Sequence, residues 1–186
     1  VRHACMDMSA AYAKGVGLAL PQAQISYDRF HVIAMANEAM DQVRRTEMHD
    51  DAPAVRAALG TDDRKTLKQL LWGMRRNPAS WSKPQVNAMH WLQRSALKSA
   101  RAWRLKMGLR AVYAAARVHN DPERASADLR AWLSWARRCR LDPFKKLATT
   151  IKDRFAAVVR GMTDNRSNAY VEAMNGLLQQ AKRAAR

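Results

Sequence analysis

The chain has 186 residues, of which 48% are hydrophobic, so it is long and apolar enough for one domain with a core and is not wholly disordered. It carries 33 lysines and arginines against 16 aspartates and glutamates, a net charge of +17. The longest run without a charged residue, Gly15 to Tyr27, excludes a transmembrane helix, and the two cysteines, Cys5 and Cys139, exclude a disulfide framework.

The compartment expected from these features is a reducing cytoplasm. We expect no signal peptide, because Asp7 falls where an apolar stretch should begin.

A compact βαβ unit is predicted within the first 30 residues. Residues 3–6 form a short apolar strand before Asp7, residues 9–20 form an alanine-rich helix, and residues 24–27 alternate as a strand that stops at Asp28. Two strands joined by a helix should be parallel. Ligands of open α/β sheets bind beyond the carboxyl ends of the strands, so both aspartates are well placed for chemistry.

Helices are predicted for most of the remaining chain. Asp121-Pro122 and Asp142-Pro143 are helix starts, with Asp as the N-cap and Pro in the first turn. The expected ranges are 32–45, a helix capped by Thr61 and carrying Leu67 to Met74, 84–118 with a break near Ser95, 122–139, 143–161 and, after a loop at 163–167, 168–183.

The basic charge lies outside the first 60 residues, which have a net charge of −1 against +18 for residues 61–186. Such an excess is typical of a protein that binds a polyanion, most often nucleic acid. A solvated arginine-rich surface, a ribosomal protein and a membrane-surface protein are the alternatives. Phosphate contacts are predicted for Arg94, Lys98, Arg101, Arg104, Lys106 and Arg110, of which the first three fall near one helical face at i, i+4 and i+7.

Six tryptophans lie between residues 72 and 135, among arginines. Their helical spacing favours a place in the core, and base stacking is the alternative.

The predicted last helix carries a polar stripe at steps of four, three, four and three residues, formed by Asn168, Glu172, Asn175, Gln179 and Lys182. A carboxylate between two carboxamides is unusual in so basic a chain. The stripe is either a solvated face or a metal-binding carboxylate flanked by amides.

Structural roles are open for the other candidates. Asp7 could cap the helix that starts at Ser9, while Asp28 and His31 could be a strand-end turn and a buried histidine. A zinc site from Asp28 and His31 with Cys5 or Cys139 lacks the usual paired cysteine spacing.

The sequence contains four short motifs in order, namely Met6-Asp7-Met8-Ser9, Leu20-Pro21, Tyr27-Asp28-Arg29-Phe30-His31-Val32 and Ser167-Asn168-Ala169-Tyr170-Val171-Glu172-Ala173-Met174-Asn175. Together they resemble the bacterial insertion-sequence transposases of the ISL-three family, over essentially the whole chain. The Asp28-x-x-His31 spacing is also similar to a signature found in related transposase groups. The resemblance implies a location at the bacterial nucleoid.

The resemblance implies an RNase H-like fold with three catalytic acids that hold two Mg²⁺ (or Mn²⁺) ions. The second acid corresponds to Asp7 and the third to Glu172, with Asp28, His31, Asn168 and Asn175 in support. Ala169 and Ala173 stand where the family often has glycine. The first acid, like the family's N-terminal DNA-binding and zinc-finger regions, would precede Val1, so we expect this chain to be inactive alone.

The fold class expected is therefore α/β by fold, with a partial RNase H-like core, but mostly α by content, with a large all-helical insertion. The expected domains are a partial core at 1–36, a helical insertion at 37–162 and a returning catalytic helix at 163–186. The implied function is metal-dependent DNA cleavage and strand transfer in transposition, with transposon-end and target DNA as partners. A homo-oligomer is left open, and no membrane or small-molecule substrate is implied. The alternative is a non-catalytic basic helical DNA-binding module.

Overall fold

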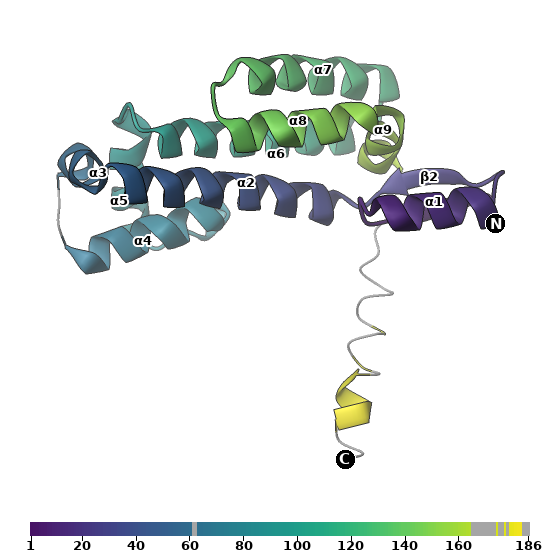
Figure 1. Ribbon diagram of the computed structural model, residues 1–186, viewed down its shortest axis with the longest axis horizontal. Helices are drawn as coiled ribbons and strands as arrows, with labels where there is room; N and C mark the ends of the chain where they lie inside the picture. Colours follow the sequence, from purple (N-terminus) through teal and green to yellow (C-terminus); the bar gives the residue numbers. More distant parts are fainter. Residues whose placement is uncertain (61–62, 165–173, 175–176, 178, 184–186) are drawn as a thin grey trace. The chain divides into compact units, whose positions relative to one another are not determined.

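The computed structural model describes the chain except for residues 61–62, 165–173, 175–176, 178 and 184–186 (Figure 1). The described part is mostly helical with one small parallel sheet, as the sequence predicts. The elements are β1 (His3–Met6), α1 (Ala10–Ala19), β2 (Gln24–Tyr27), α2 (Arg29–Asp50), α3 (Ala52–Leu59), α4 (Arg64–Arg75), α5 (Lys83–Arg94), α6 (Lys98–His119), α7 (Pro122–Arg138), α8 (Asp142–Asp153) and α9 (Phe155–Thr163).

The chain divides into two compact units. The strand unit contains residues 1–32, 112–129 and 151–186, and the helical unit contains residues 33–111 and 130–150. The predicted division at 1–36, 37–162 and 163–186 stays a prediction. Within the described residues, no helix is long and apolar enough to cross a membrane.

In the strand unit, β1 and β2 pair in parallel, with His3 opposite Gln24 and Met6 opposite Tyr27. This confirms the predicted βαβ unit. Ser9 is the N-cap of α1, and its hydroxyl accepts a hydrogen bond from the Tyr12 N–H. The predicted alternative of Asp7 as this cap is therefore wrong.

Helix α9 lies against β2 and closes the core of the strand unit. The Arg160 Nε donates to the carbonyl of Ile25 at 2.9 Å. A Cβ atom on Gly161 would stand 2.1 Å from the Tyr27 carbonyl oxygen, so the helix approaches the strand as closely as only glycine allows. The single helix predicted for 143–161 is instead two, α8 and α9, with Arg154 between them in a non-helical conformation.

In the helical unit, α4 packs on α5, and Gly73 of α4 faces the Met89 side chain. The indole N–H of Trp132 donates to the Leu105 carbonyl, and that of Trp81 donates to the Gly73 carbonyl. Indole rings thus join neighbouring helices while their one polar group is satisfied.

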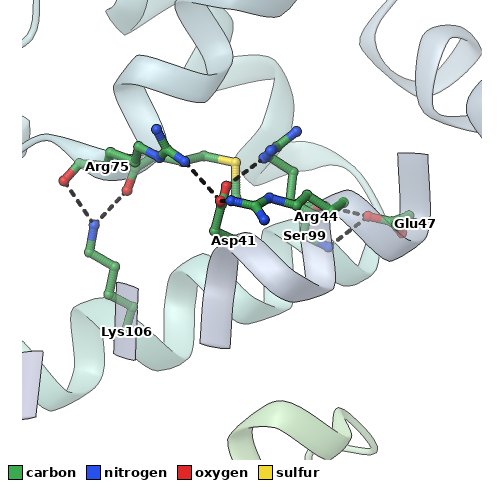
Figure 2. Close-up of polar contacts among 8 residues, drawn as sticks. Asp41, Arg44, Glu47, Arg75, Ser99 and Lys106 are labelled. Atoms are coloured by element: carbon green, nitrogen blue, oxygen red, sulfur yellow. Dashed lines mark hydrogen bonds and ion pairs between the residues drawn. The ribbon is translucent and has the colours of Figure 1, made fainter. Parts of the chain in front are cut away.

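The predicted break near Ser95 is confirmed, since α5 ends at Arg94 and α6 begins at Lys98. The first turn of α6 is held by Glu47 of α2, which is buried. Its carboxylate accepts hydrogen bonds from the backbone N–H groups of Lys98 at 2.6 Å and Ser99 at 2.8 Å, and from the Ser99 hydroxyl (Figure 2). A buried carboxylate from α2 therefore accepts the hydrogen bonds that an N-cap side chain would accept at the start of α6.

The other helix starts follow the sequence in part. Asp121 caps α7 as predicted, accepting from the Glu123 and Arg124 N–H groups. Helix α8 begins one residue earlier than expected, at Asp142, whose carboxylate binds Lys145. Asp63, not Thr61, caps α4, because its carboxylate accepts from the N–H groups of Lys65 and Thr66.

The tryptophans divide between core and surface. Trp103 and Trp132 are buried, as the core interpretation predicts. Trp72, Trp91 and Trp135 are 41% to 56% exposed. Spacing alone could not make this distinction, because it fixes the face of a helix and not what covers that face.

Candidate active site and basic surface

Asp7 follows β1 directly, at the carboxyl end of that strand. Its Oδ1 atom lies 3.1 Å from Nδ1 of His31, close enough for an ion pair but without the alignment of a hydrogen bond. The two side chains are 39% and 34% exposed. The Asp7 carboxylate is thus held beside a histidine and is still accessible from solvent.

Asp28 follows β2 and is buried, with 1% exposure. One carboxylate oxygen accepts a hydrogen bond from the Phe30 N–H at 2.7 Å, and its backbone carbonyl accepts from the Val32 N–H. Asp28 therefore caps the start of α2, which supports its interpretation as a strand-end turn. His31 lies in the first turn of the helix that Asp28 begins.

Tyr113 of α6 is a buried neighbour of this site that the sequence did not single out. Burial raises the pKa of Tyr113 well above its usual value, and the negative charge of Asp28 raises it further. The phenol of Tyr113 is therefore neutral. No local pattern could have pointed to it, because Tyr113 reaches the strand unit only through the fold.

The remaining predicted ligands are not assembled in the described residues. Glu172, Asn168 and Asn175 lie outside the part of the chain that the structure describes. Among the described residues, no three His, Cys, Asp or Glu side chains are grouped to hold a metal, so Asp28, His31 and Cys5 form no zinc cluster, and the alternative with Cys139 stays a prediction. Asp7 does fit a divalent cation, since an accessible carboxylate is the donor that Mg²⁺ prefers.

The predicted phosphate-binding residues fall on two helices. Arg94 ends α5, whereas the others lie on α6, so the expected continuous face of Arg94, Lys98 and Arg101 does not exist. Arg94, Lys98 and Arg104 are exposed, and Arg101 and Arg110 are half-buried. These five remain candidates for phosphate contact.

Lys106 is the exception, and its prediction as a phosphate contact is corrected. It is fully buried, and its Nζ donates to the backbone carbonyls of Met74 at 2.5 Å and Arg75 at 3.3 Å (Figure 2). These carbonyls end α4 and have no partner within that helix. The ammonium therefore caps the negative end of α4 and is not available to DNA.

The stability of the fold should depend on pH through Lys106. Burial, and to a smaller extent the positive charge of Arg110, lowers the pKa of Lys106 to about 8. Between the pKa of about 8 in the folded chain and the ordinary lysine pKa of 10.5 in the unfolded chain, the unfolded chain binds more protons. The free energy of unfolding therefore rises with pH across this range. The contribution of Lys106 is fully present above pH 10.5 and is lost as the pH falls through 8. The free energy of unfolding, measured relative to Lys106→Met, should rise by about 2 to 3 kcal/mol from pH 7 to pH 10.

Urea unfolding of both proteins at the two pH values gives this difference. The control is Lys98→Met, an exposed lysine at the start of the same helix, which should differ from the native chain equally at both pH values. If the free energy of unfolding of the native chain relative to Lys106→Met were the same at both pH values, the lowered pKa of the buried Lys106 would be contradicted.

A second polar cluster joins α2 and α4. Asp41, 5% exposed, binds Arg44 and Arg45 of its own helix and Arg75 of α4, at 3.0, 2.6 and 2.8 Å (Figure 2). Burial alone would raise the pKa of Asp41, but the arginines outweigh burial and hold that pKa below its usual value. The i, i+3 and i, i+4 spacings of Arg44 and Arg45 could have indicated two of these pairs.

Comparisons with known proteins give one consistent relationship. The model of a family described as "Transposase", the ISL3 group of DDE transposases, matches residues 1–186. The transposases for insertion sequence element IS1557 of two Mycobacterium tuberculosis strains, CDC 1551 / Oshkosh and ATCC 25618 / H37Rv, are each 28% identical over 200 residues. The match covers 100% of this chain and 44% of each relative, so the chain spans less than half of their length. No solved structure matches.

Proposed function

Because the chain belongs to the ISL3 family of DDE transposases, we propose that it is part of the catalytic region of an enzyme that moves an insertion sequence by cutting and joining DNA. Asp7 carries this proposal, since its accessible carboxylate stands at the carboxyl end of a strand in a parallel βαβ unit. We take this unit to be part of an RNase H-like core, with Asp7 and Glu172 as two of its three acids.

The spacing of Asp28 and His31 has a structural explanation in this proposal. Asp28 caps α2, which fixes where the helix begins after β2. The helix then brings His31, three residues later, to 3.1 Å from the Asp7 carboxylate. Asp28 and His31 are therefore positioning residues, which hold the catalytic aspartate in place.

Asp7 and Glu172 would hold the divalent cations, with Asn168 and Asn175 flanking Glu172. Such cations, when bound, stabilise the attacking and leaving oxygens of an in-line phosphoryl transfer. The chain covers 44% of the length of each curated relative, and we propose that the first acid of the triad lies in the part of that length which it does not cover. The 186-residue polypeptide is thus proposed to be insufficient for cleavage.

The DNA surface is proposed to include the exposed Arg94, Lys98 and Arg104, with the half-buried Arg101 and Arg110 beside them in the helical unit. Log affinity falls as log salt concentration rises, and each phosphate contact that is lost should make this slope shallower by about 0.9. Replacing the three exposed residues by alanine should therefore make the slope shallower by about 2 to 3.

Fluorescence anisotropy of a labelled duplex at several salt concentrations measures the slope. A triple alanine variant at Lys83, Arg137 and Lys146 is the matched control, because it removes the same charge from exposed positions of the helical unit. Equal slopes for the two triple variants would place the DNA surface elsewhere. No measurable binding of DNA by the native chain would contradict the proposed partner.

A further inference from the structure

The helical unit contains a cavity of about 740 Å³ that is partly open to solvent. That volume lies in the range of ligand pockets. The floor is apolar and comes from several helices: Met48 of α2, Leu67, Leu70 and Leu71 of α4, Leu92 of α5, and Leu97 before α6. The wall toward α6 is fixed, because Ser99 there is bound to Glu47 (Figure 2).

The rim of this cavity is positively charged. Arg64, Lys65 and Lys68 line it from the first two turns of α4, and all three are exposed. The N-terminus of a helix already carries a partial positive charge, and cations placed there are unfavourable unless an anion is near. The first turn of α4 contains no acidic residue.

Asp63 is the carboxylate that lines the cavity among the described residues, and it is engaged with the backbone. Its oxygens accept from the N–H groups of Lys65 and Thr66 and from the Thr66 hydroxyl, and these hydrogen bonds lower the pKa of Asp63. An anion brought by a ligand would therefore complement both the three cations and the end of the helix.

We propose that this cavity is a docking groove for an acidic amphipathic α-helix of a partner protein. Apolar side chains on one face of that helix fill the leucine-lined floor, and carboxylates beside them meet Arg64, Lys65 and Lys68. The proposal does not depend on the proposed transposase function, because it uses no residue of the strand unit.

The chemistry of the groove favours a helix over the other anionic occupants. Phosphates of DNA would match the cations, but a duplex offers little apolar surface for a floor of leucines, and none of the described residues that line the groove is an aromatic on which a base could stack. A fatty acid would match an enclosed cavity, whereas this one is partly open to solvent. An open apolar groove with a charged rim suits an amphipathic helix.

The test is the binding of a labelled helical peptide to the 186-residue chain, followed by fluorescence anisotropy. The peptide has leucines at i, i+3, i+4 and i+7 and glutamates beside them, and a second peptide has lysine in place of every glutamate. We expect saturable binding of the acidic peptide, and at least tenfold weaker binding of the lysine peptide. The double variant Lys65→Glu/Lys68→Glu should weaken binding of the acidic peptide by about tenfold or more.

Two control variants are matched to the groove. Lys83→Glu changes an exposed lysine in the first turn of α5, outside the groove, and Val86→Asn changes an exposed apolar residue of the same helix. Both should bind the acidic peptide as the native chain does. Leu71→Asn, on the floor, should bind at least tenfold more weakly while its circular dichroism matches that of Val86→Asn.

Four results would overturn the proposal. They are no saturable binding of the acidic peptide, equal affinity for the two peptides, an unchanged affinity in Lys65→Glu/Lys68→Glu, and binding of dodecanoate where the acidic peptide does not bind. Asp7→Asn should leave peptide binding unchanged, so a failure here is distinguishable from a failure of the catalytic proposal.

Discussion

Replacing Glu47 by alanine should lower the free energy of unfolding by about 3 kcal/mol or more, because the variant loses the buried carboxylate that holds the start of α6. Two backbone N–H groups and the Ser99 hydroxyl lose their acceptor, and the site lies too far inside for water to replace it at no cost. Urea unfolding followed by circular dichroism measures the loss.

Glu38→Ala is the matched control, because Glu38 lies on the same helix with its side chain exposed. It should change the free energy of unfolding by no more than about 0.5 kcal/mol. Glu47→Gln should fall between the two, since it keeps one acceptor oxygen and loses the charge. A Glu47→Ala variant as stable as Glu38→Ala would show that α6 begins without this cap.

Gly161→Ala should destabilise the strand unit by about 3 kcal/mol, although alanine is the better helix former by about 1 kcal/mol. A Cβ atom at this position would stand 2.1 Å from the Tyr27 carbonyl oxygen, a backbone atom that cannot rotate away. Helix α9 would have to move off β2, and the hydrogen bond from Arg160 to Ile25 would be lost with it. The melting temperature should fall accordingly.

The control uses a second helical glycine of the same unit. Nothing lies within 4 Å of a Cβ atom built on Gly17 of α1, so Gly17→Ala should leave stability unchanged or raise it by up to about 1 kcal/mol. If both variants behaved like Gly17→Ala, α9 would not lie directly against β2.

The features predicted correctly from sequence are those set by near neighbours in the chain. The βαβ unit, the break at Ser95 and the cap at Asp121 each depend on a few adjacent residues. The strand-end turn at Asp28, one of the two roles left open for that residue, belongs here too, because an N-cap and the first turn after it are one local structure.

The features missed depend on contacts between distant segments. Lys106 has the spacing of a surface cation, and only the end of α4 lying beside it explains its burial. Glu47 is one acidic residue among several in its helix until the start of α6 meets it. Gly161 is similar, since a side chain is excluded there by the backbone of Tyr27, which is distant in the sequence. Sequence periodicity gives the face of each helix and not its neighbour.

The central claim of the catalytic proposal is that Asp7 and Glu172 are ligands of the divalent cations. Binding of Mn²⁺ by the 186-residue chain, measured from the electron paramagnetic resonance of the free ion, tests it without requiring cleavage. Asp7→Asn and Glu172→Gln should each weaken Mn²⁺ binding by about tenfold or more, because each removes a carboxylate ligand. Glu123→Gln, at an exposed position of α7, should bind as the native chain does. Mn²⁺ binding that neither substitution changes would contradict this claim and leave a non-catalytic basic DNA-binding module as the better account.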